Sequence, residues 1–291
     1  MTTEAHKHSS DPSYRTKVVD YFKAKADDYD LVDHQVYWRL SDTLLWETLD
    51  SEVLKRLPPD FTFLDAGGGT GRWSDHMLCV YPQARGHLYD LSPDMVRQAT
   101  IKAERKGYSD RLAVKIGLLE NVEQHYASSG FDLVFNAHNV LGFVDDPGEV
   151  IKQLANLLKP GGMLVSFLPN KYHLTFFNIF VGNLDEAEMP GRTGRGRFTA
   201  QMPYIHLFTP HGVVEQYDAA GLSVTKLTGF PNAIYPGMQE TAIRGSTASL
   251  ENMLGDPERF DRVLAIERAL LREPDIAARG NNIFVVGTKN R

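Results

Sequence analysis

Cysteine, long apolar runs and excess positive charge are all scarce in this 291-residue chain. The single cysteine, Cys79, excludes an intrachain disulfide framework and a multi-cysteine metal site, and a reducing cytoplasm is the expected location. No run of about 18 apolar residues occurs, so no transmembrane helix is expected. Acidic residues outnumber basic ones by 37 to 31, which argues against a globally basic nucleic-acid-binding protein but not against a local basic patch.

The length allows about two domains, or one large α/β domain with insertions. Residues 1–13 are polar and are predicted to form a disordered tail rather than a secretory signal. Apolar residues then recur at steps of three and four, which predicts helices over 14–30 and 36–57, ended by Pro58 and Pro59. Residues 14–58 are therefore interpreted as an N-terminal helical cover.

From residue 59 short apolar runs alternate with helical patterns, which indicates a parallel sheet covered on both faces. The alternation stops at residues 170–209, a segment long enough to be functional or to carry its own small structure. A helix and a strand follow, then a mostly helical stretch over 231–280 and a last strand near the C-terminus. The predicted strands are 61–66, 87–92, 111–117, 131–137, 161–169, the end of 209–230, and 281–289.

The strongest motif is DAGGGTG, residues 65–71, at the end of the first predicted strand. Glycines let the backbone approach a ligand closely, and ligands bind at the carboxyl ends of strands in open α/β sheets. Arg72 stands where a dinucleotide fingerprint needs its last glycine, which disfavours a nicotinamide oxidoreductase. Asp90 ends the next strand, where an acidic residue accepts hydrogen bonds from ribose hydroxyls. The alternative for Asp90 is a cap on the helix that follows.

Together, DAGGGTG, LYDLSPDMV, AHNVLGFVDDP and LLKPGG resemble the class I S-adenosylmethionine-dependent methyltransferases. The resemblance implies an α/β, Rossmann-like fold with a seven-stranded, mostly parallel sheet and helices on both faces. It places the methyltransferase domain at residues 59–291, with an insert at 170–209 after strand five. It also implies an enzyme that binds S-adenosylmethionine and releases S-adenosylhomocysteine.

The resemblance further implies the residues that bind the cofactor. Asp65 and the loop glycines match the part of the family motif around the methionine and ribose. Leu118 and Leu119 replace the acidic residue that often reads the adenine amino group, which leaves that contact to the backbone or to Glu120. The implied set is Asp65, Gly67, Gly68, Gly69, Asp90, Leu91, Met95, Leu118, Leu119 and His138.

Several segments are also similar to the bacterial tRNA methyltransferases that esterify 5-carboxymethoxyuridine, including the segment 178–199. In that family an arginine before the glycine motif binds the carboxylate region of the cofactor, and Arg39 matches it in approximate position. A guanidinium suits a carboxylate because its donors form a planar fork. In place of a lysine-rich insert this chain has Arg192, Arg195 and Arg197, which either contact phosphates or belong to a lid or solvated loop.

Methyl transfer to a carboxylate needs no base, whereas other oxygen or nitrogen acceptors can need one. The catalytic candidates are His138, after the fourth strand, and His173, after the fifth. His206 and His211 are further histidines, and Tyr29 could orient the acceptor. No histidine or carboxylate spacing predicts a metal site.

These patterns favour methyl transfer to an oxygen or nitrogen of a small-molecule metabolite, and the alternative is a carboxylate on a modified wobble uridine of tRNA. A cofactor-binding regulatory protein without catalysis is a third interpretation. The expected partner is a small-molecule acceptor, with tRNA as the second option and no membrane. The expected assembly is a monomer or a homodimer.

Overall fold

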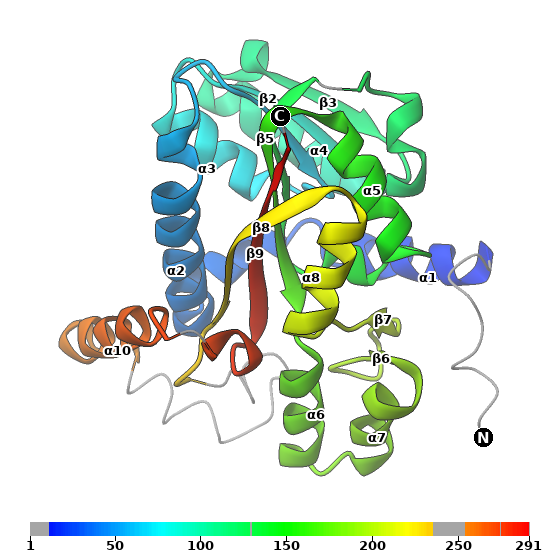
Figure 1. Ribbon diagram of the computed structural model, residues 1–291, viewed down its shortest axis with the longest axis vertical. Helices are drawn as coiled ribbons and strands as arrows, with labels where there is room; N and C mark the ends of the chain where they lie inside the picture. Colours follow the sequence, from blue (N-terminus) through cyan, green and yellow to red (C-terminus); the bar gives the residue numbers. More distant parts are fainter. Residues whose placement is uncertain (1–11, 129, 235–253, 274, 291) are drawn as a thin grey trace.

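A computed structural model of the protein describes residues 12–128, 130–234, 254–273 and 275–290. Its centre is a seven-stranded sheet in the order β3-β2-β1-β4-β5-β9-β8 (Figure 1). The first five strands run parallel, and β9 is antiparallel to both β5 and β8. The seven-stranded, mostly parallel sheet predicted from sequence is therefore confirmed. Its strands are β1 (Thr62–Ala66), β2 (Arg85–Asp90), β3 (Leu112–Ile116), β4 (Phe131–Asn136), β5 (Leu158–Pro169), β8 (Leu222–Phe230) and β9 (Asn282–Lys289).

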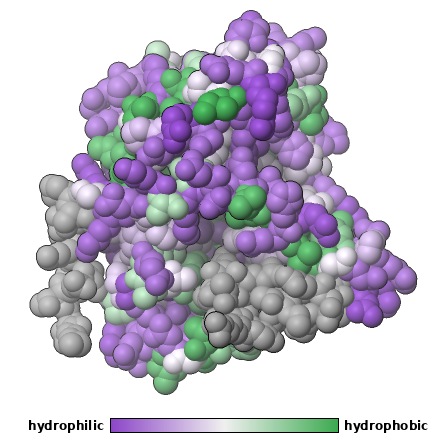
Figure 2. Space-filling view, turned by 180° about the vertical axis from the view of Figure 1, so that it is seen from behind, coloured by the Kyte–Doolittle hydropathy of each residue, from purple (hydrophilic) through white to green (hydrophobic). Residues whose placement is uncertain are grey.

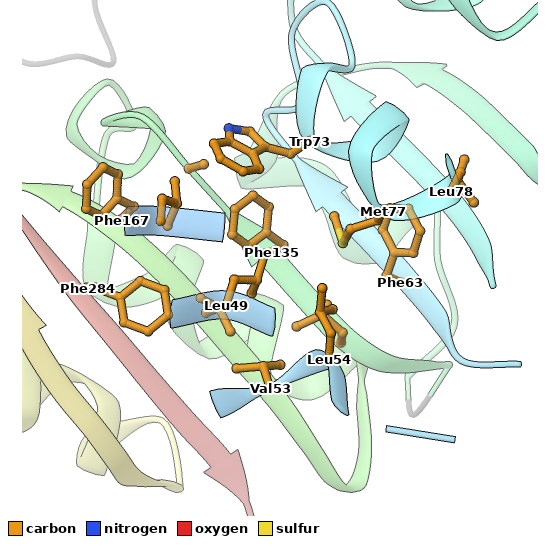
Figure 3. Packing of buried hydrophobic residues seen from close by; sticks show 14 of the residues in the cluster. Leu49, Val53, Leu54, Phe63, Trp73, Met77, Leu78, Phe135, Phe167 and Phe284 are labelled. Atoms are coloured by element: carbon orange, nitrogen blue, oxygen red, sulfur yellow. The ribbon is translucent and has the colours of Figure 1, made fainter. Parts of the chain in front are cut away.

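Consecutive strand residues point to opposite faces of the sheet, and each face has its own core. Phe63 and Phe284 belong to one core, with α2 (Val36–Glu52), α3 (Arg72–Val80), α4 (Pro93–Lys106) and α10 (Pro257–Leu270). Figure 3 shows this core, with Leu49 and Val53 beside Phe284. Their sequence neighbours Leu64 and Val285 belong to the other core, with α5 (Pro147–Leu157) and α8 (Pro210–Ala219).

The N-terminal cover is more broken than its apolar periodicity predicts. Helix α1 (Pro12–Lys23) begins inside the predicted tail, ends before the acidic run that starts at Asp27, and is followed by the 3-10 turn η1 (Tyr29–His34). Acidic groups at a helix C-terminus oppose its dipole, which is a physical reason for the early end. Helix α2 likewise ends before the prolines, in the 3-10 turn η2 (Leu54–Arg56). Among the helical patterns that alternate with the strands, the one between β3 and β4 forms only the 3-10 turn η4 (Leu119–Gln124).

The insert after β5 forms a small lobe of its own (Figure 1). It contains α6 (Lys171–Phe180), α7 (Leu184–Thr193) and a short hairpin of β6 (Arg195–Gly196) and β7 (Ile205–His206). Further along, the predicted helical stretch contains α10 and the 3-10 turn η6 (Ile276–Ala278), while 235–253 lie outside the described residues.

The face of the molecule opposite to Figure 1 is largely hydrophilic, with small separate apolar patches (Figure 2). Within the described ranges, no helix combines the length and apolarity that crossing a bilayer requires.

Candidate functional site

A crevice opens at the carboxyl ends of β1 and β4. The strand order reverses there, because β2 and β3 lie to one side of β1 while β4 and β5 lie to the other. Crossover helices diverge at such a point and leave room for a ligand. The lining includes nearly all the residues implied by the sequence motifs: Asp65, residues 67–69, Asp90, Leu91, Met95, Leu118, Leu119 and His138.

The glycine loop, residues 67–69, forms part of the floor of the crevice. Glycine is required there because a larger side chain would collide with its neighbours at two of the three positions. Gly67 has φ +80°, and a Cβ on it would lie 2.3 Å from Cγ1 of Val140, across the crevice wall. A Cβ on Gly68 would lie 2.7 Å from Cγ of Asp65. Gly69, at φ +54°, has open space around the Cβ position, so its backbone faces the cavity. A ligand can therefore approach the backbone directly.

Asp90 is held by the backbone with hydrogen-bonding capacity left over. Its Oδ2 accepts a hydrogen bond from the N–H of Gly69 and its Oδ1 accepts one from Ser92, each at 2.8 Å. Burial raises the pKa of the Asp90 carboxyl against the effect of these bonds. Each oxygen keeps a second lone pair for a ligand hydroxyl. Ser92, not Asp90, is the N-cap residue of α4, so the capping alternative for Asp90 is wrong.

Asp65 lies beneath the loop as a second buried carboxyl group. Its Oδ2 accepts a hydrogen bond from Oγ of Ser74 at 2.7 Å. Burial raises its pKa to about 7, and the neighbouring charge of Asp90 adds to the increase. Asp65 is therefore partly protonated near neutral pH.

Helix α1 and turn η1 roof the crevice from the N-terminal side. Arg15 pairs with Asp145 at 2.5 Å, and the ring of Phe22 meets Phe143 edge-on at 5.2 Å. Asp30 accepts a hydrogen bond from Thr70 of the glycine loop and pairs with Lys102 of α4, both at 2.6 Å. The roof is thus tied to elements on both sides of the crevice.

Four residues form a polar cluster at the end of the crevice near Gly67. Arg72 lines the crevice and pairs with Asp33 of η1 and, at 2.5 Å, with Asp42 of α2. Nε2 of His138 lies 3.5 Å from Oδ1 of the same Asp42. Burial opposes ionisation of Asp42, but bonding to His138 and the charges of His138 and Arg72 hold its pKa below the ordinary value.

Two sequence-predicted residues lie outside this crevice. Arg39 donates a hydrogen bond to the carbonyl of Leu254 at 3.2 Å and stacks on Phe260 at 4.6 Å, so it faces α10 rather than the crevice. The assignment of Arg39 to the cofactor is therefore wrong. The arginines that line the crevice are Arg15 of α1 and Arg72, which stands at the position that breaks the dinucleotide fingerprint. His173 sits in α6, near Phe198, where burial lowers its pKa to about 4.

Of Tyr29 and the two remaining candidate histidines, only Tyr29 lines the crevice. Tyr29 lines the crevice, and burial raises its pKa to about 12, so its hydroxyl is neutral at ordinary pH. His206 lies in the insert hairpin, where burial and Arg195 lower its pKa to about 4. His211 lies on the surface beside Glu215. In the described part of the chain, no group of three metal-ligating side chains comes together.

Sequence reasoning missed most of the roof and one wall. Phe22 and Trp73 line the crevice but carry no motif signal, since each is an ordinary core-type residue. Val140 and Phe143 lie in the motif AHNVLGFVDDP, but no role was predicted for them. Arg72 had a signal, because an arginine directly after a glycine motif begins a helix at the ligand end of the sheet.

Comparison with known proteins agrees with this geometry. Residues 64–164 match a family described as methyltransferase domain. This chain therefore contains a methyltransferase domain. The domain match covers β1 through most of β5, the strands whose ends carry the crevice.

Two curated relatives are similar over about half of the chain. The tRNA 5-carboxymethoxyuridine methyltransferase of Escherichia coli K12 is 34% identical over 162 residues, 54% of this chain and 59% of that protein. The malonyl-[acyl-carrier protein] O-methyltransferase of Hahella chejuensis is 30% identical over 152 residues, 52% of this chain and 49% of that protein. The matched region therefore spans less than two thirds of either relative.

Solved structures share the fold at low sequence identity. An S-adenosylmethionine-dependent methyltransferase from Methanosarcina mazei superposes with a TM-score of 0.55 at 16% identity, covering 82% of this chain and 96% of that one. Geranyl diphosphate C-methyltransferase from Streptomyces coelicolor, solved with S-adenosylhomocysteine, has a TM-score of 0.51 at 13% identity, covering 84% and 79%.

Proposed function

We propose that this protein transfers a methyl group from S-adenosylmethionine to an oxygen or nitrogen of a small-molecule metabolite bound in the crevice. Residues 59–291 form the methyltransferase domain in this proposal, and residues 14–58 cover it. The open backbone at Gly69 and the spare lone pairs of Asp90 fit a nucleoside with ribose hydroxyls. The bound sulfonium would supply an activated methyl group, so the protein's work is alignment and exclusion of water.

The observation that supports a small acceptor concerns the side-chain contacts of the three arginines in the insert. Arg192 pairs with Glu188 within α7, and Arg197 pairs with Glu186 at 2.6 Å. Arg195 lies 5.4 Å from the ring of Tyr14, a residue of the roof. Arg192 and Arg197 are thus paired with glutamates of α7, and Arg195 faces the roof, which argues against an open groove of free cations for phosphates.

The proposal assigns a role to several residues that line the crevice. Asp90 accepts the ribose hydroxyls, while Leu91, Met95 and Leu119 contact the adenine. Arg72 holds the carboxylate of the methionine part with the donors that its aspartate partners leave free. Phe22 and Phe143 exclude water from above.

The experiment has a binding step and a turnover step. Calorimetry should show S-adenosylhomocysteine binding and no comparable binding of NADH; tighter NADH binding would overturn the assignment. S-adenosylmethionine is then incubated with pooled metabolites or with total tRNA, and S-adenosylhomocysteine is counted by mass spectrometry. Turnover in the metabolite pools supports the proposal. Binding without turnover in any pool supports the regulatory alternative.

The second candidate is the carboxylate of a modified wobble uridine in tRNA, and the 34% identity to the Escherichia coli enzyme favours it. Turnover with tRNA alone would establish it. Arg192→Ala is a clean probe because this side chain is 65% exposed and pairs with Glu188 on its own helix. A loss of tRNA binding in Arg192→Ala would assign the insert to RNA.

Location and assembly belong to the same proposal. The single cysteine suits a reducing compartment, so we propose a cytoplasmic protein. A monomer or homodimer is proposed, and light scattering of the purified chain distinguishes the two.

A further inference from the structure

His138 and Asp42 form a buried pair at the end of the crevice near Gly67. Nε2 of His138 and Oδ1 of Asp42 are 3.5 Å apart, and neither atom has a hydrogen bond to another described residue. Catalytic hydrogen bonds are often this long in a ligand-free protein and tighten when substrate binds. Since Nε2 is turned toward Asp42 and His138 lines the crevice, Nδ1 is the ring nitrogen left for a ligand.

The imidazole ring is fixed by its surroundings. Trp73 stacks on it at 5.9 Å, and the rings of Trp38 and Phe167 meet it edge-on at 6.0 and 5.8 Å. His138 also has φ +53°, a left-handed backbone conformation that non-glycine residues rarely adopt. Such conformations persist where the surrounding structure imposes them, frequently at active sites.

The next residue shows how the surroundings impose it. Asn139, at φ +71°, accepts a hydrogen bond from the side chain of Asn282 of β9 at 2.7 Å, which anchors the turn to the sheet. The left-handed turn is therefore held by the first residue of β9.

Other charged or titratable groups surround the pair on the elements packed against it. Arg72 shares Asp42 with His138, and Asp33 of η1 is the second partner of Arg72. His76 of α3 stacks on the far side of the aromatic cluster, 6.2 Å from Trp73. Tyr29 and Asp65 line the same crevice. Of these groups, Asp42 is the one within contact distance of the imidazole.

We infer that Asp42 orients His138 as a general base, and that the acceptor is therefore a hydroxyl compound rather than an ionised carboxylate. This inference rests on the proposed function and narrows its acceptor. A carboxylate is already ionised at neutral pH, so a positioned base would have no proton to remove. The buried Nε1–H of Trp73, which has no partner among the described residues, suits an oxygen acceptor.

The reaction balances with the groups present. The acceptor oxygen forms a bond to the methyl carbon while its proton passes to Nδ1 of His138. The carbon–sulfur bond breaks, and its electron pair stays on sulfur in neutral S-adenosylhomocysteine. The imidazolium faces the Asp42 carboxylate until it returns the proton to water.

The first test does not depend on the acceptor. Nitrogen NMR of the intact protein with S-adenosylhomocysteine should show neutral His138 with its proton on Nε2 and a bare Nδ1. In Asp42→Asn the side-chain amide can turn its NH₂ toward Nε2, so part of the ring population should carry its proton on Nδ1 instead. Asp33→Asn is the matched control, since it removes the other carboxylate of Arg72 and does not contact His138. A proton on Nδ1 in the wild type, or the same tautomer in Asp42→Asn and wild type, overturns the dyad.

The second test names the acceptor class. Alcohols and phenols, each matched with the carboxylate of the same carbon skeleton, are offered with S-adenosylmethionine. Turnover of hydroxyl compounds is expected, and turnover of the carboxylates alone overturns the inference. With the hydroxyl compound turned over fastest, His138→Asn should lower kcat by about 10²- to 10⁴-fold, and Asn tolerates the left-handed backbone. Asp42→Asn should lower kcat about tenfold and Asp42→Glu should recover part of it.

Separate measurements of kcat and of cofactor binding distinguish the dyad from Asp65. Asp42→Asn should lower kcat at saturating S-adenosylmethionine. Asp65 lies in the floor of the crevice, so Asp65→Asn should act on S-adenosylhomocysteine binding. Failure of S-adenosylhomocysteine to bind would remove the proposed function itself, whereas normal binding with turnover of carboxylates alone removes only this inference.

Discussion

The floor of the crevice consists of strand ends and their loops, Asp65, residues 67–69 and Asp90, whereas the roof consists of α1 and η1. The floor is held by backbone hydrogen bonds of the sheet, such as the N–H of Gly67 to the carbonyl of Tyr89 at 2.7 Å. The roof is held by side chains, among them the ion pairs Arg15–Asp145, Asp30–Lys102 and Asp33–Arg72 and the edge-on contact of Phe22 with Phe143. We therefore expect that a substitution in the floor disturbs the whole binding site, whereas a substitution in the roof removes one contact and leaves the others in place.

The largest effect is expected from Gly67→Ala in the floor. The new Cβ would overlap Val140 at 2.3 Å and would have to adopt φ +80°. We expect binding of S-adenosylhomocysteine to weaken by more than about 100-fold, measured by calorimetry. Gly182→Ala is the control, since it has φ +76° in open space and should leave binding unchanged. Tight binding by Gly67→Ala would show that the floor is as adaptable as the roof.

The second largest loss of S-adenosylhomocysteine binding is expected from Asp90→Asn. An amide would present its NH₂ to one of the two backbone N–H groups that the carboxylate now accepts, so one buried donor is left unpaired. Such a loss costs about 1–3 kcal/mol, which corresponds to roughly 10- to 100-fold weaker binding of S-adenosylhomocysteine. Asp94→Asn, whose carboxylate pairs with Arg97 on the surface of α4, should bind normally. Equal effects of the two variants would exclude a ribose role for Asp90.

Phe22→Ala tests the roof. It removes the edge-on contact with Phe143 and opens the crevice to water. Loss of one such contact and its buried area predicts about tenfold weaker binding of S-adenosylhomocysteine, with folding retained. Leu31→Ala, at an exposed position of η1, is the control. An effect larger than that of Gly67→Ala would reverse the comparison of floor and roof.

Asp65→Asn tests the floor through pH. The pKa of Asp65 rises from 3.8 to about 7 on burial, so the folded protein keeps a proton that the unfolded chain releases. The free energy of unfolding therefore falls as pH rises from about 4 to about 7, and the Asn variant escapes this loss. The Tm of Asp65→Asn relative to wild type should rise steadily across that window. A constant Tm difference, as expected for surface Asp60→Asn, would mean that Asp65 is not buried as described.

The smallest effect belongs to Arg39→Ala, compared with Arg72→Ala. Arg39 faces Leu254 and Phe260, so its removal should change binding of S-adenosylmethionine less than twofold. Arg72 lines the crevice, and its removal should weaken binding about tenfold. Calorimetry that gave the opposite order would restore Arg39 as the cofactor arginine.

The floor was accessible to prediction because local sequence specifies it. A glycine loop after a buried strand, and an acid after the next strand, place their ligand groups at one edge of a parallel sheet whatever the rest of the chain does. The cofactor contact predicted for Arg39 was wrong because a helix turns about 100° per residue. The position of a residue in the chain therefore does not say whether its side chain lies on the side of α2 that faces the crevice. His173 lies outside the crevice because it belongs to α6 of the separate lobe. Its position directly after β5 in the sequence does not show which way the chain turns there.

The sequence by itself determined the alternation of strands and helices, the seven-stranded sheet, the glycine loop and Asp90, because periodicity and turn chemistry act over short distances. Only the tertiary structure decided that Asp42, Arg72 and His138 meet, since they come from three elements and no spacing links them. It also decided that Arg197 of the insert pairs with Glu186 of α7, because side-chain partners depend on how separate elements pack.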